Sequence, residues 1–543
     1  MATVSADINL YLRLGAWLIG VVGSSEVGET TVVGGTMRNV TADTNIGYSA
    51  IELSYGIMSS GPTDRVAETG TLSFALNNGP SNSTGQAGAY SPGHTHGVAG
   101  YDLGVECLLT FTYSGTTYYK FSGTLVSVVP SAGQYREQIT QCEAVDWMDE
   151  AAISKVKGLT VAENKRSDEC IQLLIDESVA KQPNAVDLSV GQSTFKTAFD
   201  NLLDAQTSVL RSIADATISE LGYAYIKGDT TQGGTFRFED RHSRPKAGVA
   251  VGTFSESMVG LEVQRTREDL INTVYVNVHP RTEDASATVL YELTTTDTQP
   301  SVTPGESVTL NCPYREASIN AYRVAAIDLV PLASGTDWIA NSAADGSGSN
   351  LTSSVVVEVV TQAANSTELK ITNNHATLTA YLTTLQIRGN ALKDVSETVL
   401  SATDTSSAFS YGERDARIDM KYESDTTLGL SIAQWILNIY SSPAYRVASF
   451  TLAANTSAYM MTQSLAREPG DKVTFAESQT GIATTGASGA EIGFFINGVS
   501  MTISPGGIIN TSWVLSPSSA QSAWVLDQVG ASELGISTAL GFA

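Results

Sequence analysis

The chain carries FSGTLVSVVPSAG at residues 121–133 and FINGVSMTISPGG at residues 495–507. In each stretch a proline, Pro130 or Pro505, follows the motif glycine, Gly123 or Gly498, by seven residues. Each pattern is typical of a strand, a glycine that permits a bend or bulge, a second strand, and a turn into a third. Two copies several hundred residues apart predict one chain built on two related barrels, unless the match is a coincidence in a chain rich in glycine, serine and threonine.

Length and charge limit the class of protein. At 543 residues the chain is too long for one core and predicts about three or four domains. A hydrophobic content of 42% indicates a globular protein. The formal charge of −25, from 31 basic and 56 acidic groups, argues against a non-specific grip on nucleic acid, which needs Lys and Arg to neutralise phosphate.

Cysteine spacing and hydropathy exclude two further classes. The four cysteines make no disulfide framework, and none lies in the paired spacing of a zinc site. No apolar run reaches membrane-spanning length. Residues 14–22 (LGAWLIGVV) lack the basic region of a signal peptide, so they are expected to form a buried first strand.

Periodicity changes along the chain and predicts the local elements. Strand patterns dominate up to about residue 155 and again from Thr273 onward, and Val355–Val360 is expected to be a core strand. Between them, helical spacing predicts two helices and then a hairpin. Ser167 is expected to cap the first helix, Gly222 to end the second, and 223–226 with 235–238 to form the hairpin. A later helix is expected at 425–441, stopped by Pro443.

The residues that could carry chemistry form no complete site. His94 and His96 are the only histidine cluster, and the flanking glycines favour a solvated loop over a metal site. The stretches 43–47 and 345–348 faintly resemble calcium loops, but turns are the default interpretation. Asp146 and Asp149 are expected to cap the following segment, and Trp147, Trp435, Trp513 and Trp524 to be core or interface anchors. We therefore predict no catalytic residue, no cofactor-binding residue and no metal site.

Several stretches together resemble the central hub of a bacteriophage tail tip or baseplate, a family of long-tailed phages. They are Gly70–Tyr90, CEAVDW at 142–147, the helix–hairpin at 199–241, Thr273–Val278, SYGER at 410–414 with its following helix, and the ending from Trp524 to Phe542. The resemblance covers most of the chain, and its motifs are structural, none catalytic.

The resemblance implies a mainly β, multidomain fold: two related hub β-barrels, a small α+β helix–hairpin domain and an inserted β-sandwich. The expected divisions are 1–155 for the first barrel, 156–245 for the small domain, 246–281 for the start of the second barrel, 282–390 for the sandwich, and 391–543 for the rest of the second barrel with the helix at 425–441. The chain ends about 35 residues after the second motif, so it is expected to lack the C-terminal extension with which some hubs carry a lysin.

The implied function is structural. A homotrimeric ring would present a pseudo-sixfold surface to a hexameric tail tube, hold distal and peripheral tip or fibre proteins, and leave a channel through which DNA passes without specific binding. Such a protein is a virion component at the tail tip, assembled in the bacterial host cytoplasm, with no enzymatic activity, no cofactor and no membrane insertion by this chain. The alternatives are a tail fibre or adhesin that binds a glycan receptor, and a carbohydrate hydrolase with unrecognised carboxylates.

Overall fold

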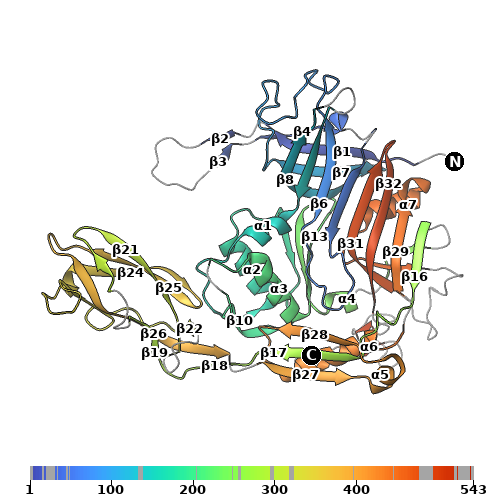
Figure 1. Ribbon diagram of the computed structural model, residues 1–543. Coiled ribbons are helices and arrows are strands. Elements are labelled where there is room, and N and C mark those ends of the chain that lie inside the picture. Colours follow the sequence, from blue (N-terminus) through green and yellow to red (C-terminus); the bar gives the residue numbers. More distant parts are fainter. Residues whose placement is uncertain are drawn as a thin grey trace.

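A computed structural model gives the arrangement of the chain (Figure 1). The structure describes residues 4–14, 17–19, 31–33, 35–44, 47, 49–132, 138–202, 205–246, 249–254, 259–293, 299–316, 323–394, 397–443, 446–475, 493–518, 522–523 and 538–539. Its fold is mainly β and is divided among several sheets, which confirms the predicted fold class.

The largest sheet has 13 strands and contains both glycine motifs. Its first set of strands runs in the order β5-β6-β9-β8-β7-β1, with β4 at the outer edge. The bounds are β1 Asp7–Leu14, β4 Thr36–Asn39, β5 Ile51–Gly56, β6 Thr71–Asn77, β7 Glu106–Tyr113, β8 Thr116–Pro130 and β9 Ile139–Val145. The second set runs β16-β29-β32-β31-β30-β15. Its bounds are β15 Gly252–Phe254, β16 Val259–Gln264, β29 Arg446–Ala453, β30 Lys472–Phe475, β31 Gly493–Ser504 and β32 Ile508–Pro517.

The two sets repeat the same order in space and along the chain. Each strand of one set has a counterpart at the same place in the other set. In chain order, the first set is β1, β5, β6, β7, β8 and β9, and the matching strands of the second set are β15, β16, β29, β30, β31 and β32. The one difference in direction is that β15 pairs with β30 in parallel, whereas β1 pairs with β7 antiparallel. The glycine motif therefore occupies the middle strand of an antiparallel meander twice, in β7-β8-β9 and in β30-β31-β32.

The pairing register repeats as well. A row of paired residues crosses four strands of each set, and in both sets it starts two residues after the motif glycine. The rows are Leu125, Ala144, Leu72 and Leu53 in the first set, and Ser500, Ser512, Thr451 and Val259 in the second. Strand order and register thus agree with the duplication that the motif predicts. Closure of each set into a barrel remains a prediction.

The motif strands differ from the sequence expectation in one respect. Each was expected to be two strands separated by a bend or bulge at the glycine. The bulges are present, at Lys120 and Val126 in β8 and at Asn497 in β31, but β8 and β31 are each a single strand. A bulge absorbs one residue without ending the ladder, so the strand continues past the glycine. The turn at 505–507 leads from β31 into β32 as expected, whereas Gly133 lies outside the described residues.

One hydrophobic core draws on both sets. β31 of the second set pairs antiparallel with β5 of the first, so the sheet is continuous across them. The buried cluster includes Leu12, Phe74 and Phe111 from the first set, and Phe254, Phe450 and Trp513 from the second. The expected first strand at 14–22 is wrong in position: β1 ends at Leu14, and a separate pair, β2 (Trp17–Ile19) with β3 (Thr31–Val33), follows.

A smaller α+β unit follows β9. It comprises α1 (Trp147–Ile153), β10 (Ala162–Arg166), α2 (Ser167–Ser178), β11 (Ala185–Leu188), β12 (Thr194–Ala198), α3 (Val209–Glu220), β13 (Tyr223–Lys227), β14 (Thr235–Glu239) and α4 (Ser243–Lys246). The predicted hairpin is confirmed as β13 with β14. The predicted Ser167 cap is wrong by one residue, because Ser167 is the first helical residue and its hydroxyl donates to Glu220. Gly222 follows the end of α3 as expected and its amide donates to the Thr217 carbonyl, although the left-handed residue is Leu221, at φ +61°.

A three-stranded sheet, β27-β17-β28, carries the predicted helix. The bounds are β17 Thr273–Val278, β27 Thr398–Thr403, β28 Asp415–Met420, α5 Thr405–Tyr411 and α6 Thr426–Tyr440. Asp425 caps α6 by accepting hydrogen bonds from Thr427 and Leu428, so the expected helix is confirmed within one residue. The α6 residues Ile432 and Ile436 are buried in one cluster with Val274 and Val276 of β17.

The remaining strands between 281 and 394 form the part that projects at the left of Figure 1. They are β18 (Arg281–Glu283), β19 (Thr288–Glu292), β20 (Ser301–Val302), β21 (Ser307–Pro313), β22 (Ala325–Ile327), β23 (Trp338–Asn341), β24 (Val355–Ala363), β25 (Ser366–Asn373) and β26 (Ala380–Asp394), with the 3-10 turn η3 (Thr352–Ser354). The valine run at 355–360 is not a core strand throughout. β24 is an edge strand, so Val356, Val359 and Val360 are exposed.

The other elements are short. They are η1 (Thr41–Asp43), η4 (Ala454–Thr456), α7 (Ala458–Ala466), β33 (Ser522–Ala523) and β34 (Thr538–Ala539). Among the residues that the structure describes, no helix is long and apolar enough to cross a bilayer. All four cysteines are buried free thiols. The domain boundaries given by the sequence remain a prediction.

Candidate functional site

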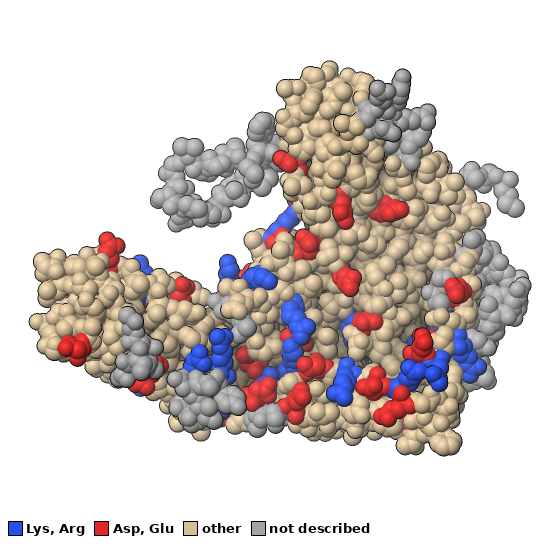
Figure 2. All heavy atoms as spheres, viewed as in Figure 1, with Lys and Arg blue, Asp and Glu red and all other residues tan. Residues whose placement is uncertain are grey.

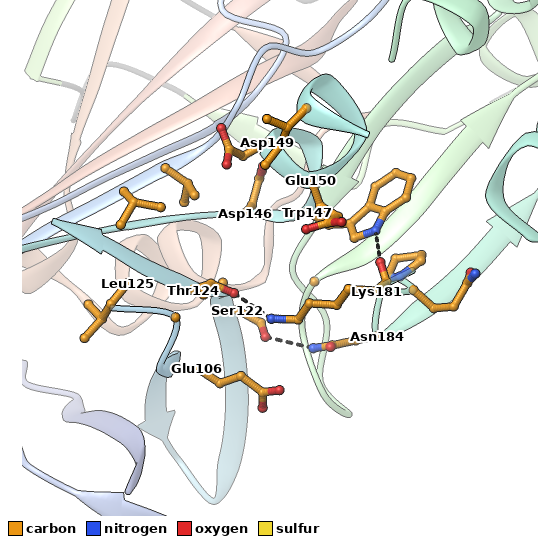
Figure 3. A pocket seen from close by; sticks show the side chains of 18 of the residues that line it. Glu106, Ser122, Thr124, Leu125, Asp146, Trp147, Asp149, Glu150, Lys181 and Asn184 are labelled. Atoms are coloured by element: carbon orange, nitrogen blue, oxygen red, sulfur yellow. Dashed lines mark hydrogen bonds between the residues drawn. The ribbon is translucent and has the colours of Figure 1, made fainter. Parts of the chain in front are cut away.

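A cavity of about 520 Å³ opens beside the first glycine motif. It lies where β8, the start of α1 and the segment 181–184 meet, so the large sheet and the α+β unit both line it. Figure 3 shows its side chains from close by. The lining residues include Leu103, Glu106, Ser122, Gly123, Thr124, Val126, Asp146, Trp147, Asp149, Glu150, Ile153, Lys181 and Asn184.

The wall of the cavity depends on Gly123. A Cβ atom at this position would lie 2.1 Å from the carbonyl oxygen of Val145, a distance that no side chain tolerates. The glycine thus lets β8 approach β9 closely and brings the next residues of β8 to the cavity.

Two hydrogen bonds connect the α+β unit to this strand. Lys181 Nζ donates to Thr124 Oγ1 at 2.7 Å, and Asn184 Nδ2 donates to Ser122 Oγ at 2.8 Å. Figure 3 shows both contacts across the cavity mouth. They hold the segment 181–184 against the motif strand on either side of its glycine.

Asp146 and Trp147 have structural roles at the base of the cavity. Asp146 Oδ1 accepts the backbone N–H of Met148 at 3.0 Å and caps α1, as the sequence predicts. Trp147 Nε1 donates to the carbonyl of Lys181 at 2.8 Å, and its ring packs edge-on against Phe236 with centroids 5.3 Å apart. The expectation that this tryptophan is an anchor is therefore confirmed.

The cavity is acidic in its lining and apolar at its rim. Burial raises the pKa of Asp146 to about 7, because a carboxylate loses hydration there. Asp149 and Glu150 stand in the first turn of α1, where the helix dipole favours negative charge. Leu103, Val126 and Ile153 are exposed, which suits contact with a protein surface carrying apolar and basic groups.

The other residues that the sequence singled out occupy turns. His94 and His96 lie in a loop and are exposed, with their rings 5.3 Å apart. Asp345 accepts hydrogen bonds from Ser347, as an ordinary turn residue does. Asp43 is buried, and both of its carboxylate oxygens accept hydrogen bonds, from Ser83 and Tyr90. Trp524 and residues 45–46 lie outside the described residues.

Sequence patterns missed a buried polar network. Glu468 Oε1 accepts from Lys120 Nζ at 2.5 Å, and Glu468 Oε2 accepts from Tyr55 Oη at 2.8 Å and from the Gly228 amide at 3.0 Å. Lys120 Nζ also donates to the Arg467 carbonyl at 3.0 Å. The network joins both strand sets to the α+β unit. No local signal identifies it, since its members are hundreds of residues apart.

On the face drawn in Figure 2, acidic and basic groups are interspersed over the lower part of the molecule, around the α+β unit and the β27-β17-β28 sheet. The upper part, over β1, β7 and β8, carries few charged groups. This face therefore holds no continuous basic stripe of the kind that grips nucleic acid.

Comparison with known proteins gives structural similarities only. No family model matches the chain, and no curated protein matches it. A tail protein from Neisseria meningitidis is 9% identical, with 94% of this chain and 96% of that one covered and a TM-score of 0.45. A 43 kDa tail protein of a Shewanella oneidensis prophage is 11% identical, with 93% and 98% covered and a TM-score of 0.43.

An Escherichia coli component of the type VI secretion system, described as structurally similar to phage T4 tail proteins, is 8% identical, with 87% of this chain and 74% of that one covered and a TM-score of 0.36. By their descriptions, the first two of these solved structures are phage tail proteins and the third is a secretion-system component.

Proposed function

We propose that the chain is the hub subunit of a phage tail tip, three copies of which form a ring that joins a hexameric tail tube to the tip proteins. The observation that carries this proposal is the duplicated six-strand order, with the glycine strand in the same place and register in each set. Two similar strand sets in each of three subunits make six similar surfaces, which matches a sixfold partner.

The contact between the two sets suggests how the ring closes. Within the chain, residues 498–503 of β31 pair with β5. The counterparts of these two strands are β8 and β16. β8 pairs with β7 up to Thr124, and the Leu125 backbone is bonded to Gly104 and Val105, so beyond Leu125 no described strand pairs with this side of β8. Among the described strands, β16 has a neighbour on one side, β29.

These edges fit a head-to-tail contact between copies. Val126 and Val129 lie on the free stretch of β8 and are 43% and 57% exposed. In Figure 1, β8 and β16 lie toward opposite sides of the large sheet. Pairing β8 of one copy with β16 of the next repeats the β31–β5 contact between chains. A contact between two different surfaces closes into a ring when the rotation allows it.

The finer parts of the proposal follow from this ring. DNA leaves through its centre without specific binding, and distal and peripheral tail proteins attach around it. The projecting part at 282–390 serves such peripheral contacts. We assign no catalytic activity to the chain, because Asp146, the buried carboxyl with the raised pKa in the cavity, is held as a helix cap. The position at the tail tip and assembly in the host cytoplasm belong to the same proposal.

The ring is tested with charges placed on the free edge of β8. The variant V126K/V129K should remain folded and lose the trimer, because lysines on an edge strand oppose its pairing with another strand. The matched control is V359K/V360K on β24, where the valines are 52% and 54% exposed and lie on the projecting part. Particle mass by sedimentation, alone and with tail-tube protein, is the readout. A ring that persists in V126K/V129K would overturn this closure.

The channel is tested on the assembled ring. We expect no tight binding of duplex DNA at physiological salt, since each Lys or Arg contact to phosphate would slow passage. Gel-shift titration of the ring with duplex DNA measures this. Tight, salt-sensitive binding would contradict the proposal that DNA passes through the ring without being bound.

A further inference from the structure

Three side chains with metal-binding atoms converge at one end of the β27-β17-β28 sheet. They are His279, just after β17, Glu397, just before β27, and Asp419 in β28. One ligand atom of each lies within 4.8 Å of the others. His279 is largely buried, with 13% of its side chain exposed, while Asp419 is 49% exposed.

The sheet itself brings these residues together. Val274, Val276 and Val278 of β17 are buried in the cluster that contains α6, so the alternate residues, Tyr275 and Asn277, occupy the opposite face. His279 continues this alternation by one step. Asn277 pairs with Val399 on β27 and with Asp419 on β28, so groups from all three strands share one face and one end.

The existing contacts place these groups next to one another, and the hydrogen-bonded pair would have to separate by about 1 Å to bind one ion. His279 Nε2 lies 2.5 Å from Asp419 Oδ1, and its Nδ1 lies 3.5 Å from Asp394 Oδ2. Glu397 Oε2 accepts a hydrogen bond from Asn277 Nδ2 at 3.0 Å. The other amide atom, Asn277 Oδ1, is buried and has no hydrogen-bond partner among the residues that the structure describes.

Charge at this position is unbalanced. Asp394, Glu397 and Asp419 surround one imidazole. The nearest guanidinium, Arg281, donates mainly to the buried Asp200, at 2.5 Å. Lys421 is directed to Asp215. Three carboxylates therefore share a single imidazole and a guanidinium that is already engaged.

We propose that His279, Glu397 and Asp419 bind a divalent cation of the zinc class. One imidazole nitrogen and two carboxylate oxygens are ligands that zinc accepts at about 2.0–2.2 Å, with water in a fourth position. The cation takes the place of the proton between His279 Nε2 and Asp419 Oδ1, so binding releases a proton. Asp394 at the other ring nitrogen orients the imidazole, as carboxylates do beside metal-bound histidines.

The position of the ligands gives the site a structural consequence. His279 precedes β18 and Glu397 follows β26, the first and last strands of the projecting part. Asp419 belongs to the sheet from which that part departs. A cation bound by His279, Glu397 and Asp419 would tie the two connections between the projecting part and this sheet to strand β28. This inference stands independently of the proposed ring.

The test uses the full chain without a histidine tag, stripped with a chelator and titrated with zinc chloride by calorimetry. We expect one zinc per chain and a higher unfolding temperature with zinc. E397Q should weaken binding at least tenfold while keeping the hydrogen bond from Asn277, so its fold is preserved. H279Q should abolish binding. The control H94Q/H96Q removes the exposed loop histidines and should bind zinc as the unmodified chain does.

Two results would overturn the site. One is the absence of zinc binding by the unmodified chain up to millimolar concentration. The other is unchanged affinity in E397Q and H279Q with loss in H94Q/H96Q, which would assign any binding to the loop.

Discussion

Gly498 in β31 pairs with Gly56 in β5, at the place where the two strand sets of the large sheet meet. Gly56 has a φ of +87°, and a Cβ atom there would lie 2.6 Å from the carbonyl oxygen of Asn497. A Cβ at Gly498 would lie 2.7 Å from the carbonyl oxygen of Ile57. The two backbones approach so closely that neither residue can carry a side chain, which explains the glycine in the second motif.

The first prediction concerns this contact. G56A should lower the free energy of unfolding by about 2–4 kcal/mol, since it adds a backbone clash to an unfavourable φ. The control is G115A, where φ is +81° but the added Cβ meets nothing within 4 Å. Denaturant unfolding of both variants separates the clash from the backbone strain. Equal losses in the two variants would show that close approach is unimportant.

Local sequence patterns predicted the parts of the fold that depend on local forces. The hairpin at 223–239 and the helix α6 follow from turn residues, spacing and an aspartate cap, all within a few residues of each other. The valine run of β24 was misassigned because burial depends on the position of a strand in its sheet, and an edge strand leaves one side open.

The candidate sites depend on distant pairings and could not be predicted in this way. Lys181 reaches Thr124 across 57 residues, and Lys120 reaches Glu468 across 348. His279 and Asp419 meet because two strands 140 residues apart are paired in parallel. No period in the sequence encodes such contacts. The glycine motif was informative because it occurs twice. Its two copies identify β8 and β31, which occupy the same place in the two strand sets.

The second prediction concerns the projecting part. Glu283 on β18 pairs with Leu392 on β26, so a two-residue Asn-Gly turn can replace residues 284–391 and close the two strands as a hairpin. The shortened chain should fold and keep the ring. It loses only contacts such as the hydrogen bond from the Ala364 amide to the Leu159 carbonyl. Circular dichroism and particle mass are the measurements. An unfolded product would show that this part belongs to the central core.

The third prediction concerns the Lys120–Glu468 pair. The Lys120 side chain is fully buried, so removing its partner leaves an uncompensated charge in the interior. E468Q should cost about 3–5 kcal/mol of unfolding free energy. The double variant K120M/E468Q should recover part of this loss, because the unpaired charge is gone. A double-mutant cycle by chemical denaturation measures the coupling, and independent, additive losses would disprove it.

The last prediction concerns pH. Burial raises the pKa of Asp146 from 3.8 to about 7, so between these values the folded chain holds a proton that the unfolded chain has released. Stability from this group is complete below pH 4 and falls as pH rises to about 7, by roughly 4 kcal/mol in all. D146N keeps the acceptor for the Met148 amide and removes the titration. Its unfolding free energy should depend less on pH between 4 and 7 and exceed that of the unmodified chain at pH 8. A variant with an unchanged pH slope would mean that the carboxyl does not titrate in this range.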